Sequence, residues 1–294
     1  MEIASGLPAF EWHRDLDYSG ESLRAEAPAH FAKVFEDEIH ELRPVAIVEA
    51  DASGKAVYEG EWNKEENVID GRGVKVWPDG SRYEGFWSDG EQHGYGRMIH
   101  LRGDVYIGQW AHSRANGYGR YSYADEGMTY AGYWKDDTQH GFGKEIWEDG
   151  TTYEGHWDMG KKEGRGTFTQ PNHGVYEGDF LNGNIHGRGK FTWNDGRVYE
   201  GEWANNVMHG EGLFTWADGR YYKGSYQDDR KHGYGIFTLA DGSRYEGNWK
   251  DGKQHGRGKF ITQDGQTKKG TWDGGKFVEW VSSQRASRVS EVNS

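Results

Sequence analysis

The sequence predicts an all-β protein, built as an elongated, single-layer antiparallel sheet of stacked β-hairpin repeats. One short aromatic pattern recurs nine times at a nearly constant spacing. The composition agrees with this prediction, because 46 Gly, 14 Trp and 18 Tyr stand among the 294 residues, whereas Leu occurs only eight times. Helical bundles and doubly wound α/β folds depend on aliphatic residues, so the composition argues against both. We therefore expect a core made of aromatic rings and glycines.

The repeated pattern is Tyr-x-Gly-x-Trp, in which another aromatic residue can replace Trp. Its copies begin 23 to 25 residues apart, and a tenth, degenerate copy starts at Lys268. Gly-x-Gly, usually led by His, follows each complete copy, and Asp-Gly often precedes the next one. A single hairpin is only marginally stable in water, so we expect the copies to stack on one another. The nine complete copies begin at Tyr58, Tyr83, Tyr106, Tyr130, Tyr153, Tyr176, Tyr199, Tyr222 and Tyr245.

Each 23-residue unit is expected to hold two strands and two turns. Asp-Gly is typical of a tight hairpin turn, because both residues tolerate positive φ, and Asp195–Gly196 is one example. Residues i, i+2 and i+4 of a strand share a side, which places Tyr199 and Trp203 together and Glu200 on the opposite side. With strands ~4.8 Å apart, the array predicts a rod of roughly 90 Å with an aromatic groove along one curved side.

The opposite side is expected to be polar and partly self-neutralising. A row of glutamates on the first strands faces a row of Lys and Arg on the second strands. Such cross-strand pairs contribute ~0.2–1 kcal/mol each and fix the register. The two rows comprise Glu59, Glu84, Glu154, Glu177, Glu200 and Glu246, and Arg97, Arg120, Lys144, Lys190 and Lys259.

The segment 1–57 differs from the array, with three glycines and twelve acidic against five basic residues. The apolar spacing over about 28–43 predicts an amphipathic helix, which Pro44 would end. A hairpin around Asp51–Gly54 is expected to follow and to cover the open edge of the first repeat. An alternative is that the helix binds a partner.

The array is expected to extend over 58–281 and to end in a closing strand. This strand would contain Phe277, Val278, Trp280 and Val281. The tail 282–294 is polar, and its composition predicts disorder.

The combination of Tyr-Glu-Gly-x-Trp, His-Gly-x-Gly and Asp-Gly at a 23-residue period resembles the MORN (membrane occupation and recognition nexus) repeat. The resemblance covers Tyr58 to about Trp280 and implies the extended antiparallel sheet. Some copies depart from the pattern: Phe180 and Tyr226 replace Trp, and Lys75 and Glu145 occupy positions on the aromatic side. Stand-alone arrays of this family occur in the radial-spoke heads of motile cilia and in cortical cytoskeletal proteins, so the resemblance implies a structural protein.

The sequence predicts no enzyme, cofactor or metal site. There is no cysteine, and histidines that recur once per repeat lie about 10 Å or more apart, too far to converge on one zinc ion. Gly247, Gly252 and Lys253 imitate a phosphate-binding loop but lack the Ser or Thr that follows in such loops. The chain also lacks the pattern of a signal peptide, and no apolar stretch is long enough to span a membrane. We therefore expect a soluble protein of the cytoplasm.

The first functional hypothesis is a scaffold that binds protein partners in a larger cytoskeletal assembly, such as a ciliary or flagellar axoneme. The net charge of −13 argues against nucleic acid as a partner. Homodimer formation remains open. The candidate groove residues are Tyr153, Trp157, Tyr176, Tyr199, Trp203 and Tyr245. A second candidate contact surface, on the polar side, consists of Tyr95, Tyr118, Phe142 and Tyr234, which stand between the glycines of Gly-x-Gly.

The alternative hypothesis is a phosphoinositide- or membrane-binding module, which the family name implies. The array itself carries a net charge of −7, because the first 57 residues contribute −7 and the tail +1 to the total of −13. Anionic membranes attract polybasic segments, so an acidic array gains little from them. The candidate lipid-binding residues are Lys161, Lys162, Lys268 and Lys269.

Overall fold

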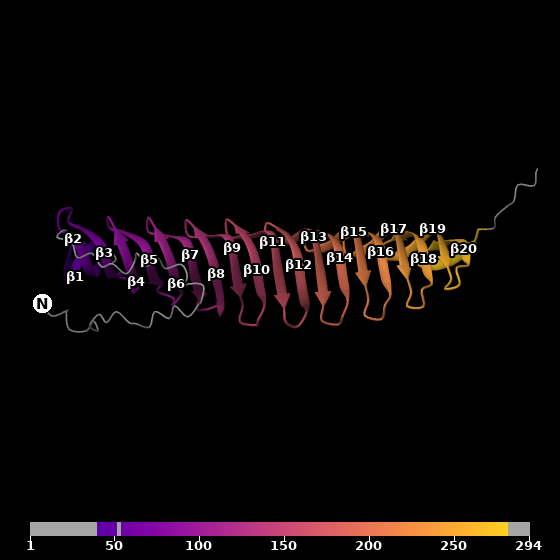
Figure 1. Cartoon of the computed structure of the whole chain (residues 1–294), viewed down its shortest axis with the longest axis horizontal. Coiled ribbons are helices and arrows are strands. Elements are labelled where there is room, and N and C mark those ends of the chain that lie inside the picture. Colours follow the sequence, from indigo (N-terminus) through magenta and orange to yellow (C-terminus); the bar gives the residue numbers. More distant parts are fainter. Residues whose placement is uncertain (1–39, 52–53, 282–294) are drawn as a thin grey trace, which may run out of the picture.

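The computed structural model describes residues 40–51 and 54–281, and Figure 1 shows them as one long row of strands. Within these two ranges, 21 strands form a single antiparallel sheet in which each strand pairs with its neighbours in the chain. No helix occurs in the two described ranges. The strands are β1 (His40–Asp51), β2 (Gly54–Asn63), β3 (Val68–Val76), β4 (Arg82–Ser88), β5 (Glu91–Ile99), β6 (Val105–Ala111), β7 (Arg114–Tyr123), β8 (Met128–Lys135), β9 (Thr138–Ile146), β10 (Thr152–Asp158), β11 (Lys161–Gln170), β12 (Gly174–Leu181), β13 (Asn184–Trp193), β14 (Val198–Ala204), β15 (Val207–Thr215), β16 (Tyr221–Gln227), β17 (Arg230–Thr238), β18 (Arg244–Lys250), β19 (Lys253–Ile261), β20 (Thr267–Asp273) and β21 (Lys276–Trp280).

The helix predicted over about 28–43 is wrong at its C-terminal end. Residues 28–39 lie outside the described residues, but His40–Arg43 belong to β1. These four residues pair with Gly60–Asn63 of β2, the first strand of the repeat array. The edge of β2 offers backbone N–H and C=O groups that need hydrogen-bond partners. Pairing with them in the sheet outweighs the helix formation that the spacing of the apolar residues favours. The hairpin expected before the first repeat is present and consists of β1 and β2.

Two kinds of turn connect the strands. After the Trp position of every complete copy except the first, both central residues have positive φ, for example 49° at Asn205 and 70° at Asn206, which is the geometry of a tight two-residue hairpin. The Asp-Gly turns differ from the expectation, because at Asp195–Gly196 only the glycine has positive φ (86°). Asp195 instead accepts a hydrogen bond from the backbone N–H of Arg197 at 3.1 Å, a contact that stabilises the wider turn.

The two glycines of Gly-x-Gly have different roles. In β13 the first is Gly187, whose φ of 67° lies in the left-handed region that favours glycine. The pairing of β12 with β13 is irregular between Gly178 and Phe180, so the sheet carries a bulge here. At the second glycine, Gly189, a Cβ would overlap the ring and hydroxyl of Tyr176. One glycine therefore bends the strand, and the next makes room for a tyrosine ring.

The first tyrosine of each complete copy is the most buried side chain of its repeat, and all nine are at most 2% exposed. Tyr199 illustrates the arrangement, because its hydroxyl donates a hydrogen bond to the backbone oxygen of Glu202 at 2.9 Å. Burial raises the pKa of Tyr199 well above its ordinary value, so the hydroxyl stays protonated and remains a donor. Each ring thus covers the glycines and satisfies a backbone carbonyl.

The rings pack edge to face along the whole array. The ring centroid of Tyr199 lies 5.1 Å from that of Trp203 in its own copy and 5.2 Å from that of Tyr226 in the next. Four residues of an extended strand span about 13 Å, so the short distance between Tyr199 and Trp203 shows that each hairpin bends toward these rings. We call this side the aromatic face and the opposite side the polar face. Neighbouring repeats share their rings, and the core runs as one row along the sheet.

Three lysines, Lys75, Lys162 and Lys231, lie among these rings. The Lys231 amine is 4.5–5.0 Å from four ring centroids, those of Trp216, Tyr222, Phe237 and Trp249. Burial lowers the pKa of Lys231 from 10.5 to about 8, and no carboxylate of the described residues pairs with it. Lys162 occupies the same position three repeats earlier, but its amine lies 3.0 Å from the buried carboxylate of Glu145. The charged residue at Glu145, unexpected on the aromatic face, is therefore explained by Lys162.

We expect Tyr199→Phe to lower the free energy of unfolding by about 1 kcal/mol, because the carbonyl of Glu202 loses a buried donor. Tyr221→Phe is the matched control, since Tyr221 is 38% exposed and precedes the core tyrosine of the next copy. Urea unfolding followed by tryptophan fluorescence measures both variants. If the two variants are equally stable, the role given to the core hydroxyl is wrong.

We expect Lys231→Met to raise the free energy of unfolding by about 1–2 kcal/mol at pH 7. The folded-state pKa of about 8 lies below the unfolded value of 10.5. The charged amine therefore costs stability below about pH 8, and this cost disappears as the pH rises toward the unfolded pKa. Methionine fits the site, because Met208 holds the same position one repeat earlier.

The advantage of Lys231→Met should accordingly shrink between pH 7 and pH 10, which unfolding measured across that range will show. The control is Lys162→Met, which leaves Glu145 buried without its partner and should destabilise the protein by about 1–3 kcal/mol at pH 7. Stabilisation by both substitutions would show that a buried charge at this position is unfavourable even when it is paired.

Candidate functional site

The residues predicted to line an open aromatic groove are packed in the core instead. They are Tyr153, Trp157, Tyr176, Tyr199, Trp203 and Tyr245, and each is at most 7% exposed. The bend of each hairpin toward the aromatic face closes the rings of successive repeats over one another. Within residues 54–281 these side chains stabilise the sheet, and their rings are not available to a partner.

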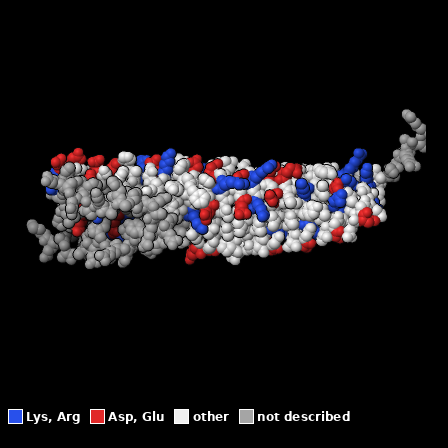
Figure 2. All heavy atoms as spheres, viewed as in Figure 1, with Lys and Arg blue, Asp and Glu red and all other residues white. Residues whose placement is uncertain are grey.

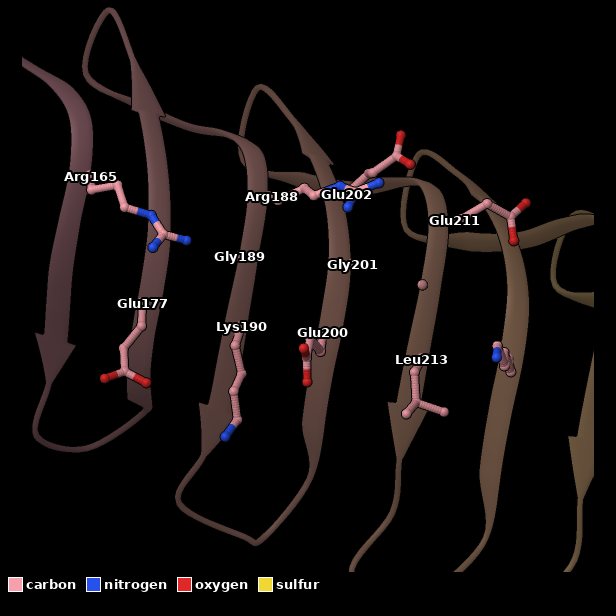
Figure 3. Close-up of a pocket in the computed structure, with 12 residues that line it drawn as sticks. Arg165, Glu177, Arg188, Gly189, Lys190, Glu200, Gly201, Glu202, Glu211 and Leu213 are labelled. Atoms are coloured by element: carbon pink, nitrogen blue, oxygen red, sulfur yellow. The ribbon is translucent and has the colours of Figure 1, made fainter.

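The groove lies on the polar face, along the line of glycines. One hollow of about 630 Å³ extends from Phe142 on β9 to Glu177 on β12. A second hollow of about 590 Å³ begins at Arg165 and Glu177 and reaches β16. Because the two hollows share Arg165 and Glu177, they form one trough, which we call the polar-face groove. Figure 3 shows the polar side chains that form its walls on both sides of Gly189 and Gly201.

Aromatic rings gather at the N-terminal end of this groove. Tyr118 and Tyr133 lie opposite each other on β7 and β8, with ring centroids 5.5 Å apart. Phe142 and His156 are paired in the same way on β9 and β10, at 5.7 Å. Tyr133 is 44% and Phe142 48% exposed, which is far more than any ring of the core. We call these four residues the polar-face ring cluster.

The charge pattern of the polar face changes at the same strands. In most copies an acidic residue follows the first tyrosine, but Ile107 and Ala131 stand there in β6 and β8. Arg120 on β7 lies between these two residues in the register. The corresponding Lys144 lies 3.0 Å from Glu154, whereas Arg120 has no ion pair within residues 54–281. An arginine without a compensating carboxylate therefore lies beside the ring cluster.

Further along the groove, the repeat positions that hold the ring cluster are occupied by charged residues instead. These residues on β11 to β15 are Arg165, Asp179, Arg188, Glu202 and Glu211. Charged residues of both signs are interspersed on the part of the surface visible in Figure 2. The groove thus joins an aromatic end to a polar segment of mixed charge, which favours a partner that lies along the array.

The outcome for the second candidate surface is mixed. Tyr95, Tyr118, Phe142 and Tyr234 lie on the polar face, as alternation predicts, but only Tyr118 and Phe142 belong to the ring cluster. Tyr234 is 55% exposed and stands apart, since its register partner is Asn248.

Sequence reasoning missed Tyr133, His156 and Arg120 as members of one site. The available signal was the residue before Trp, which is acidic in several copies and aromatic in β8 and β10. Comparing the copies column by column would have placed these rings beside those of Gly-x-Gly.

The lysine pairs proposed for lipid binding do not form basic patches. Consecutive residues of a strand point to opposite faces, so each pair is divided. The Lys162 amine is directed into the core toward Glu145, and only Lys161 of the first pair is exposed. Lys268 lies on the aromatic face, 5.8 Å from the ring centroid of Trp280, while Lys269 lies on the polar face opposite Lys259. The alternation of the strand is the physical reason that the two lysines of each pair do not lie side by side on one face.

The motif histidines link successive repeats. His140 lies 3.2 Å from Asp158 and His255 lies 3.3 Å from Asp273, and each aspartate ends the first strand of the following copy. Among the residues that the structure describes, no three His, Cys, Asp or Glu side chains are grouped so that they could hold a metal ion. In the same residues there is no helix with the length and apolar character needed to cross a membrane.

Several solved structures show similarity to this chain. The TCP10 domain of Danio rerio CPAP (E1021V mutant) has 17% identity over 71% of this chain and 98% of its own, with a TM-score of 0.41. The TCP domain of Drosophila melanogaster SAS-4 (dCPAP), in complex with a proline-rich motif of Ana2, has 17% identity over 54% of this chain and 86% of its own, with a TM-score of 0.34. No match was found among curated proteins.

The profile of the MORN repeat matches the sequence nine times, and the matched segments coincide with the hairpins from β2 to β19. They are residues 58–82, 83–104, 106–128, 130–152, 153–175, 176–196, 199–219, 222–244 and 245–267. Together they account for well over half of the chain. The MORN repeat is an interaction repeat that forms scaffolds rather than catalytic domains. With its nine profile matches and its continuous hairpin sheet, this chain belongs to the MORN-repeat family.

Proposed function

We propose that this chain is a non-catalytic scaffold that binds protein partners through the polar-face ring cluster and the groove that begins there. The observation that carries the proposal is the exposure of Tyr133 and Phe142 on the face opposite the core. The tyrosines of the core are needed for the sheet, whereas these two rings are among the exposed large apolar side chains of the described residues and can contact another molecule.

The composition of the surface supports protein rather than lipid as the partner. Interface hot spots are enriched in Tyr, Trp and Arg, and the cluster combines Tyr118 and Tyr133 with Arg120 close by. Ile107 on β6 and Ala131 on β8 stand at positions that are acidic in most copies, and both lie close to the ring cluster. Apolar area and positive charge therefore coincide there. A partner with an acidic residue flanked by apolar side chains fits this combination.

We further propose that the assembly is cytoskeletal and that it is ciliary, axonemal or cortical. The support for this step is the resemblance of the array to the stand-alone MORN arrays of radial-spoke heads and cortical proteins. The cytoplasm, with its cytoskeleton, is the corresponding location.

We expect Tyr133→Ala combined with Phe142→Ala to weaken partner capture by about 2 kcal/mol, or roughly thirtyfold in affinity. Capture from native cells with the full-length protein, in ~150 mM salt and quantified by mass spectrometry, measures the loss. Salt should leave most of the wild-type binding intact, because burial of rings is not screened.

The matched control is Tyr221→Ala, which removes a 38% exposed ring from a strand outside the cluster. Partners should be retained by this variant and lost only from the double variant, while both keep the wild-type circular dichroism spectrum. Retention of every partner by the double variant would refute binding through the ring cluster. Tyr176→Ala or Tyr199→Ala is unsuitable here, since removing a core ring would destabilise the array rather than test a contact.

The membrane alternative makes a separate prediction. We expect the protein to bind phosphatidylserine or phosphoinositide vesicles weakly and to be released by ~150 mM salt, because the lysine pairs are divided between two faces. Vesicle flotation of the wild type and of Lys161→Glu and Lys269→Glu provides the measurement. Salt-resistant, phosphoinositide-selective binding that is lost in either variant would establish the membrane function instead.

A further inference from the structure

One position on the aromatic face holds a lysine in two copies of the repeat. It is the second residue of each second strand, Lys162 in β11 and Lys231 in β17, which lies in the C-terminal half of the array (Figure 1). Each of the two lysines therefore places an amine against the core. The other complete copies have an uncharged residue at this position, namely Ile69, Gln92, Ala115, Gln139, Ile185, Met208 and Gln254.

The aromatic surroundings of the two lysines are alike. Each amine lies at most 6.0 Å from the centroids of four rings, and three of the four stand at equivalent positions of the two repeats. Ring faces attract a cation, but they do not replace the water that a charged amine loses on burial. The rings are those of Trp147, Tyr153, Trp157 and Phe168 around Lys162, and those of Trp216, Tyr222, Phe237 and Trp249 around Lys231.

The two sites differ in one carboxylate. The Lys162 amine lies 3.0 Å from Glu145, which faces the first tyrosine of the following copy in the register. At Lys231 the same position is occupied by Phe214. A phenyl ring carries no charge, so the group that stabilises the ammonium of Lys162 is missing at Lys231.

In the described part of the chain no other acidic group pairs with Lys231. The charged side chain that acts on its amine is Arg220, which has the same sign and is itself paired with Asp218 at 2.7 Å. Burial, assisted by Arg220, lowers the pKa of Lys231 to about 8. Roughly a tenth of the amine is therefore unprotonated at pH 7.

The unprotonated amine of Lys231 is a nucleophile, which the ammonium is not. Lys231 is only partly buried, so a small reagent can reach it from the solvent. The rings around it favour a reaction that removes the charge and leaves a neutral group in its place. Transfer of a short acyl chain does this, because it converts the amine to an amide. A product with a phosphate or a carboxylate would instead restore a buried charge.

We propose that Lys231 is a modification site that accepts a short acyl group from an acyl thioester. The nitrogen lone pair attacks the thioester carbonyl carbon, so that a C–N bond forms and the C–S bond breaks. The proton that the amine loses goes to the departing thiolate, and the products are an N-acyl lysine and a thiol. The amide needs no counterion, so acylation removes the buried charge and stabilises the repeats that pack around Lys231.

Incubation of the full-length protein with acetyl-coenzyme A, followed by peptide mass spectrometry, tests the proposal. At pH 7 we expect Lys231 to be acetylated at least tenfold faster than Lys162 and than exposed lysines such as Lys253. The reason is that its neutral fraction is on the order of 300-fold higher than that of an ordinary lysine. The rate at Lys231 should level off above about pH 8, whereas the rates at exposed lysines should rise toward pH 10. Equal rates at the three lysines, or one pH profile for all of them, would overturn the proposal.

Phe214→Glu supplies at Lys231 the carboxylate that Glu145 supplies at Lys162, and it should slow acetylation of Lys231 at least tenfold at pH 7. The reciprocal Glu145→Phe should make Lys162 as reactive as Lys231. The matched control is Leu213→Glu, which adds the same charge to the polar face of the same strand and should leave Lys231 as reactive as in the wild type. Circular dichroism identifies the variants that keep the sheet. Unchanged reactivity of Lys231 in a folded Phe214→Glu would also overturn the proposal, and the wild-type comparison decides it even if a variant fails to fold.

Discussion

The packing of a tyrosine ring over glycines is the constraint on which the rest of this structure depends. Each ring needs two residues without side chains beneath it, since a Cβ at a position such as Gly189 would overlap Tyr176. It also needs a bent partner strand, and Gly187, whose φ lies in the left-handed region, allows this bend. Together these features let a single-layer sheet bury large rings on one side, although no second layer covers it in the described chain.

This constraint decides which face is available for function. The aromatic face is occupied by its own packing, and the tyrosine hydroxyls are committed to backbone carbonyls along the array. The polar face carries no such requirement, so its positions can vary from one copy to the next. The repeat positions that are occupied by Tyr133, Phe142 and His156 in one region of the array are occupied by Asp179, Arg188 and Glu202 in another. A repeat of constant architecture thereby presents a surface that differs along its length.

The arrangement of charges in the array follows from the same division into an aromatic face and a polar face. Opposite charges meet across strands on the polar face, as Lys144 and Glu154 do, and Arg120 is left without a carboxylate where two acidic positions are replaced. On the aromatic face a charge is tolerated when it is paired, as in Lys162 and Glu145. Lys231 lies among four rings and forms no ion pair with a carboxylate of the described residues, and burial lowers its pKa.

The sequence by itself determined the all-β class, the register of nine hairpins and the assignment of residues to two faces. A 23-residue period with Tyr, Gly and Trp at alternate positions leaves one way to form a sheet, because a shift of one residue would expose every ring. The sequence did not determine that the aromatic side would close, since alternation assigns a face but says nothing of its curvature. That was decided by the bulge at each Gly-x-Gly, which brings Tyr and Trp within about 5 Å and removes the expected groove. Nor could it show that β2 would draw His40–Arg43 into a strand, because an open edge competes for nearby backbone only once the sheet exists. The cluster of Tyr118, Tyr133, Phe142 and His156 likewise depends on which positions face each other across strands, and this is a property of tertiary structure alone.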